Sequence, residues 1–84
     1  MARFYFHLFN GLGSARDEEG REAPSLEAAR SCAVEDIRSI ISGDARAGVV
    51  DLAGWVEIAD ERGRHLATVR FEDAVELKLP KGGA

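Results

Sequence analysis

Hydrophobic and aromatic residues fill the first nine positions in a pattern that predicts a β-strand. The stretch Arg3–Phe9 reads RFYFHLF, and aromatic side chains pack well on the pleated surface of a sheet. Because it carries a charge and lacks a leucine-rich core, we expect a strand here and not a signal peptide. Strand side chains alternate between faces, so both faces of this strand are apolar. One face carries Phe4, Phe6 and Leu8, and the other carries Tyr5, His7 and Phe9.

Glycines in the next segment predict two tight turns. The sequence NGLG at 10–13 favours a turn, after which Ser14–Asp17 is expected to pair back on the first strand. A second turn at Glu18–Gly20 leads into Arg21–Ala23. This second stretch of strand contains almost nothing apolar to bury.

The middle of the chain predicts one amphipathic helix. Ser25 is placed to cap its first turn, and Glu27 interacts favourably with the helix dipole. Gly43 and Gly48 are both possible ends, and we favour Gly48 because Ala45–Ala47 is helix-forming. The buried face repeats at steps of three and four residues through Leu26, Ala29, Ala33, Ile37, Ile40 and Ile41.

Alternation returns after the helix and predicts a β-hairpin. Gly54–Ala59 and Arg64–Phe71 alternate on either side of the polar link Asp60–Gly63. We expect Val56, Ile58, Ala67, Val69 and Phe71 to face the helix. The last apolar residues, Val75, Leu77 and Leu79, also alternate and predict a short edge strand, followed by a flexible tail at Pro80–Ala84.

These elements predict one α+β domain spanning residues 1–84. We expect a small antiparallel sheet of about four strands packed on one amphipathic helix, in the order β-β-α-β-β with a short C-terminal edge strand.

Composition and charge narrow the classes of function. The 84 residues are 45% hydrophobic with a formal net charge of -4, which disfavours nucleic acid as a partner. No run is long enough to predict a membrane helix. Cys32 is the one cysteine, which fits a cytoplasmic location and excludes an intrachain disulfide. So short a chain has a small core, which favours self-association as a homo-oligomer, such as a dimer.

Several segments together resemble a family of small bacterial proteins classed as domain of unknown function 6894. They are RFYFHL at the start, RDEEGRE at 16–22, PSLEAAR at 24–30, VEIADERGR at 56–64 and FEDAVE at 71–76. The resemblance supports the layout of the domain and implies no activity, cofactor or catalytic residue. A strand pair followed by an acidic turn and a helix also resembles the architecture of HicB-like antitoxins, which implies a basic partner protein.

Few residues carry candidate chemistry. The acidic turn Asp17–Glu22 offers carboxylates to a cation but lacks the spacing of a calcium loop. His7 and His65 would face each other if their strands were adjacent, and Cys32 or a carboxylate would complete a metal or nucleophile site. We favour packing roles for these side chains and expect no catalytic residue, metal or cofactor. A small metal or ligand binder that uses His7, His65 and the acidic turn is an alternative.

The second face of the predicted sheet is the strongest functional candidate. If one helix covers the sheet, an aromatic surface is left for a partner. The alternative is that Gly43–Ala53 folds over that surface within the monomer. We favour a non-enzymatic protein-interaction or self-associating domain whose contact residues are Tyr5, His7, Phe9, Trp55 and Leu66.

Overall fold

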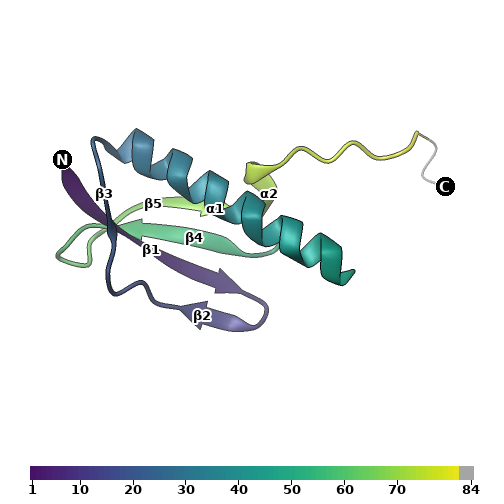
Figure 1. The fold of residues 1–84 in the computed structure, drawn as a ribbon, viewed down its shortest axis with the longest axis horizontal. Coiled ribbons are helices and arrows are strands. Elements are labelled where there is room, and N and C mark those ends of the chain that lie inside the picture. The colour runs from purple at the N-terminus through teal and green to yellow at the C-terminus, as the bar shows by residue number, and fades with distance from the viewer. Residues whose placement is uncertain (82–84) are drawn as a thin grey trace.

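A long helix lies along one face of an antiparallel sheet in the computed structural model, which describes residues 1–81 (Figure 1). Within these residues the sheet has five strands, so the predicted α+β class is confirmed. The elements, in chain order, are β1 (Ala2–Asn10), β2 (Gly13–Ala15), β3 (Arg21–Ala23), α1 (Leu26–Ala47), β4 (Trp55–Ala59), β5 (His65–Arg70) and α2 (Phe71–Ala74).

The aromatic strand β1 is the centre of the sheet, whose strand order is β2-β1-β4-β5. Along one side, β1 pairs first with β3, where Ala2 lies opposite Ala23, and then with β2, where Leu8 lies opposite Ala15. Along its other side it pairs with β4. The predicted second strand is therefore two short strands, and the chain between them contains Asp17.

Ser25 and Gly48 cap the two ends of helix α1. The Ala28 N–H donates to Ser25 Oγ over 3.1 Å, which satisfies one of the free amides of the first turn. Gly48 adopts the left-handed conformation with φ 99°, and its N–H donates to the carbonyls of Asp44 and Ala45. The predicted end at Gly48 is thus confirmed, and Gly43 lies inside the helix.

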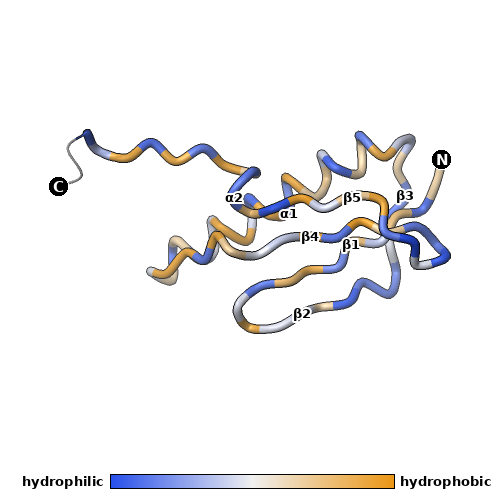
Figure 2. Tube along the Cα trace, turned by 180° about the vertical axis from the view of Figure 1, so that it is seen from behind, coloured by the Kyte–Doolittle hydropathy of each residue, from blue (hydrophilic) through white to orange (hydrophobic). Residues whose placement is uncertain are grey.

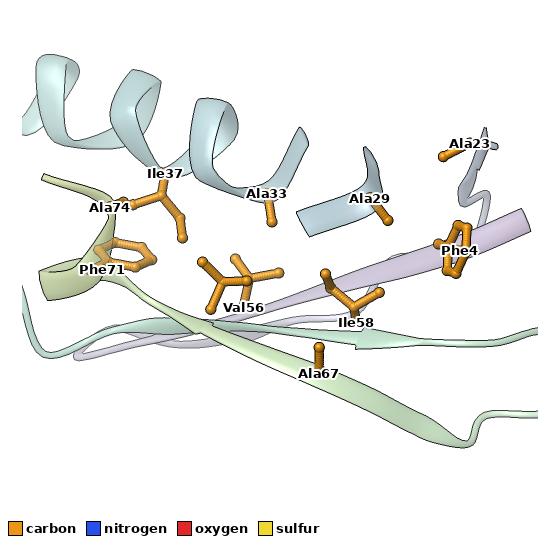
Figure 3. Packing of buried hydrophobic residues seen from close by; sticks show 11 residues of the cluster. Phe4, Ala23, Ala29, Ala33, Ile37, Val56, Ile58, Ala67, Phe71 and Ala74 are labelled. Atoms are coloured by element: carbon orange, nitrogen blue, oxygen red, sulfur yellow. The ribbon is translucent and has the colours of Figure 1, made fainter. Parts of the chain in front are cut away.

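The core lies between α1 and the sheet (Figure 3). Alanines on the buried side of the helix leave room for branched and aromatic side chains from the strands, so the two layers pack closely. The helix contributes Ala29, Ala33 and Ile37, and the sheet contributes Phe4, Val56, Ile58, Ala67 and Val69. Phe71 and Ala74 of α2 close one end. The predicted helix-facing side of the hairpin is confirmed.

The predicted C-terminal edge strand is wrong. At Phe71 the chain leaves the sheet and forms the single turn α2. Two contacts hold this turn: the Phe71 N–H donates to the Gly54 carbonyl over 2.9 Å, and Arg38 Nε donates to the Ala74 carbonyl over 2.7 Å. The following residues form no strand and lead away from the domain (Figure 1). Of the predicted tail, residues 82–84 lie outside the described residues.

No helix within residues 1–81 is long and apolar enough to cross a membrane.

Candidate functional site

The sheet face opposite α1 holds the aromatic residues singled out in the sequence. We call it the open face, because no helix or strand of residues 1–81 lies over it (Figure 1). Side chains alternate between the two faces of a strand, so the residues next to those of the core point to this open face. Its residues are Tyr5, His7, Phe9, Trp55, Glu57, Ala59, His65, Thr68 and Arg70.

Strand register arranges the open face in rows that run across the sheet. The first row is Phe9, Trp55 and Arg70. The second is His7, Glu57 and Thr68, and the third is Tyr5, Ala59 and His65. The predicted aromatic surface is therefore divided, because a polar row separates the Phe9–Trp55 pair from Tyr5.

Phe9 and Trp55 form a stacked pair at one end of the open face. Their ring centroids are 5.2 Å apart and their planes differ by 11°. Trp55 is 37% exposed to solvent, whereas Phe9 is half-buried. Trp55 Nε1 donates to Glu57 Oε2 over 3.0 Å. The indole is thus fixed in orientation by a ring on one side and a hydrogen bond at its edge, and it still presents apolar surface to solvent.

Leu66 occupies an irregular position in β5. The pairing shifts between Ile58 and Ala59, so that Ala67 lies opposite Ile58 while His65 lies opposite Ala59. Leu66 is the extra residue of this β-bulge. It is half-buried and packs against the core, so it offers less free surface than Trp55.

His7 is fixed by a hydrogen bond from the neighbouring turn. The Asp17 backbone N–H donates to His7 Nδ1 over 3.0 Å. A neutral imidazole that accepts at Nδ1 carries its proton on Nε2. His7 therefore supports the turn between β2 and β3.

Asp17 fills the gap that separates β2 from β3 along β1. Its Oδ2 accepts the Phe6 N–H over 3.0 Å, and its Oδ1 accepts the N–H groups of Glu19 and Gly20 over 3.1 and 3.0 Å. Burial alone would raise the pKa of this carboxyl, but these three donors outweigh it, and the pKa lies below its ordinary value.

The role of Asp17 was not predicted from the sequence, although its spacing to Gly20 is a signal of a side-chain-stabilised turn. Gly20 has φ 70°, and a Cβ there would lie 2.8 Å from the Phe4 carbonyl oxygen. The turn therefore needs glycine at this position.

The histidines and the cysteine are not brought together. His7 is on β1 and His65 is on β5, with β4 between them, so the two strands are not adjacent. His65 Nε2 instead lies 2.8 Å from Thr68 Oγ1, and Cys32 belongs to α1. Across residues 1–81, no three His, Cys, Asp or Glu side chains gather as a possible metal site.

The segment Gly43–Ala53 does not cover the open face, so that alternative is wrong. Its first residues belong to α1, and Val49 is 77% exposed. The remainder lies on the helix side of the sheet, where Asp44, Val49, Asp51 and Phe71 line one cavity with the β1–β2 turn.

A two-layer α+β domain with one free sheet face is the class of protein that these features define. Residues 3–72 match the family described as Domain of unknown function (DUF6894), and the chain belongs to that family. The matched region ends before the extended C-terminal segment. No curated protein and no solved structure matches the chain, and the likeness to HicB-like antitoxins stays a prediction.

Proposed function

We propose that this domain is a non-enzymatic protein-interaction module that associates with a second copy of itself through the open face. The observation that carries the proposal is the Phe9–Trp55 pair, stacked and partly exposed on a sheet face that no described element covers. Tyr and Trp are enriched at the contact residues of interfaces, because they bury a large area at a low cost in side-chain entropy. The next row places His7 beside the pair, Tyr5 lies one row further along the face, and Leu66 lies at the bulge.

The charges along the open face suit a symmetric contact. Arg70 lies at the Phe9–Trp55 end. A hollow at the Tyr5 end is lined by Asp17, Glu18, Asp60 and Glu61 together with Arg16. A twofold axis through the polar middle row brings opposite ends together, so each Arg70 faces the acidic end of the other copy. The Arg70–Glu72 ion pair is solvent-exposed and costs little to exchange.

The same charges disfavour nucleic acid on this face. Stacking of bases on aromatic side chains needs a positive potential to hold the phosphates. The chain carries a formal net charge of -4, and carboxylates surround Tyr5. We therefore propose a protein partner, and the single thiol of Cys32 favours the cytoplasm as its location.

Light scattering over a concentration series tests the proposal. We expect dimers of the wild-type chain, and at least about tenfold weaker association for Tyr5→Ala with Trp55→Ala, because two anchor side chains are lost. Leu12→Ala is the matched control, since Leu12 is a fully exposed apolar residue in the β1–β2 turn. Circular dichroism should show that all variants remain folded. A wild-type monomer at high micromolar concentration would contradict the proposal.

The other two functions suggested by the sequence stay predictions with tests of their own. A HicB-like antitoxin predicts a toxin gene beside its own gene and a basic companion protein. A metal binder predicts a rise in melting temperature with a divalent ion.

A further inference from the structure

The segment Val75–Leu79 has the features of a strand but pairs with no strand of residues 1–81. Val75 is extended, with φ -137° and ψ 154°. Apolar and charged residues alternate through the segment, as the hydropathy colours of Figure 2 show. Leu77 and Leu79 are 62% and 80% exposed. Such a segment can form backbone hydrogen bonds and bury its leucine side chains by pairing with the edge of a sheet.

The outer edge of β5 is a free sheet edge. Strand β5 ends the order β2-β1-β4-β5, so in the described part of the chain β4 is its one neighbour. The Phe71 N–H donates toward β4 at Gly54, and in an antiparallel pair such positions recur at every second residue. Ala67 and Val69 therefore also bond to β4, while Thr68 directs its N–H and C=O groups outward and Arg70 directs its N–H outward. Among residues 1–81, no strand other than β4 pairs with β5.

One side of this edge also offers apolar cover from α1. Arg38 reaches the Ala74 carbonyl, so that side of the helix faces α2 and β5. Val34 lies one turn earlier on the same side, is half-buried and packs at the margin of the core. A strand added to β5 can direct Val75, Leu77 and Leu79 toward Val34 and the aliphatic part of Arg38, and keep Glu76 and Lys78 on the other face.

The segment cannot easily reach β5 of its own chain. Phe71 is 1% exposed and Ala74 is buried, so α2 is anchored in the core. The Arg38–Ala74 hydrogen bond holds the end of α2 against the helix layer, above the plane of the sheet. The chain then leads away from the domain (Figure 1). Returning to β5 would require α2 to unwind and expose Phe71, whereas a strand from another molecule has no such constraint.

We propose that Val75–Leu79 adds as a strand to the outer edge of β5 in a second copy of this chain. Two copies can exchange their segments reciprocally, which satisfies both edges. Addition of an extended segment to a sheet edge is a recurring mode of recognition, in which main-chain hydrogen bonds provide affinity and alternate side chains provide specificity. This contact uses the edge of the sheet and does not depend on the open face.

Amide hydrogen exchange of the full chain, measured residue by residue at low micromolar and at millimolar concentration, tests the proposal. We expect exchange at the amides of Thr68 and Arg70 to slow by about tenfold or more at the higher concentration, because these amides become bonded in the dimer. The amides of the segment should slow with them.

Leu77→Asp with Leu79→Asp should abolish this concentration-dependent protection. Both side chains are largely exposed, so the domain should stay folded. The matched control is Glu76→Lys with Lys78→Glu, which preserves the alternation and the net charge and should keep the protection. Tyr5→Ala with Trp55→Ala should keep it as well, which separates this contact from association through the open face.

Three results would overturn the proposal. Protection that does not depend on concentration would show that the segment folds back on its own β5. Absence of protection at millimolar concentration would show that the edge stays free. Protection that survives Leu77→Asp with Leu79→Asp would show that another contact covers the edge.

Discussion

At the scale of single residues, one carboxylate replaces a missing strand. Between β3 and β2 the Phe6 N–H has no strand partner, and Asp17 Oδ2 accepts it. The other oxygen of the same carboxylate holds the turn through Glu19 and Gly20. The acidic turn that suggests a cation site in the sequence therefore has a structural role at Asp17.

Asp17→Ala should lower the free energy of unfolding by about 1 to 2 kcal/mol, because three backbone donors lose their acceptor. Urea unfolding measures the change. Glu18→Ala is the control, since Glu18 lies in the same turn and its side chain accepts no hydrogen bond among the described residues. Equal effects of the two substitutions would contradict the role given to Asp17.

The lowered pKa of Asp17 predicts a dependence of stability on pH. Burial alone would raise this pKa. The backbone N–H groups of Gly20, Phe6 and Glu19 donate to the carboxylate and lower the pKa by more than burial raises it. As the pH falls, the Asp17 carboxylate is therefore protonated in the unfolded chain before it is protonated in the folded chain. The stabilisation is present above the unfolded value near about pH 4 and is lost as the pH falls through the folded pKa.

Urea unfolding between neutral and acidic pH tests this dependence. The loss of stability in acid should be smaller for Asp17→Asn than for the wild type, because asparagine does not titrate. Identical pH profiles for the two proteins would contradict it.

At the scale of elements, two glycines show that the same residue has opposite roles in different contexts. Gly43 lies inside α1, and a Cβ at this position would meet no atom within 4 Å. Gly54 comes just before β4, and a Cβ there would lie 2.7 Å from the Phe9 carbonyl oxygen and 3.2 Å from the Phe71 ring. The first glycine weakens a helix, and the second permits close approach of backbones.

Gly43→Ala should therefore raise the free energy of unfolding by about 0.5 to 1 kcal/mol. Gly54→Ala should lower it by about 1 to 3 kcal/mol, because β4 must move away from β1. Thermal unfolding of the two variants checks both signs. Stabilisation by Gly54→Ala would show that β1 and β4 tolerate a methyl group between them.

At the scale of the whole molecule, the core is small and a single aromatic residue closes it. Phe71 is among the largest fully buried side chains, and it connects the end of β5 to α1 and Gly54. A chain of this length has a stability of about 3 to 5 kcal/mol from its core. The burial of Phe71 also directs the C-terminal segment out of the sheet.

Phe71→Ala should cost about 3 to 5 kcal/mol and leave much of the chain unfolded at 25 °C. Leu77→Ala should change the stability of the monomer by less than about 0.5 kcal/mol, because the side chain is largely exposed. Circular dichroism and urea unfolding at low protein concentration compare them. A folded Phe71→Ala variant would contradict the role assigned to this ring.

The sequence alone determined the elements whose signals are local. Period-two alternation predicts β1 and the β4–β5 hairpin, three-and-four spacing predicts α1, and Ser25 and Gly48 set its ends. Which strand faces point to the helix also follows from alternation, because the polar residues of β4 and β5 cannot enter the core.

Only the tertiary structure decided what depends on distant contacts. Val75–Leu79 alternates like a strand, but burial of Phe71 and the hydrogen bond from Arg38 turn the chain away before it can pair. His7 and His65 are separated because β4 lies between their strands. Asp17 lies beside β1 because its carboxylate accepts the N–H of Phe6, which is eleven residues earlier. In each case the deciding partner is remote in sequence, where periodicity carries no information.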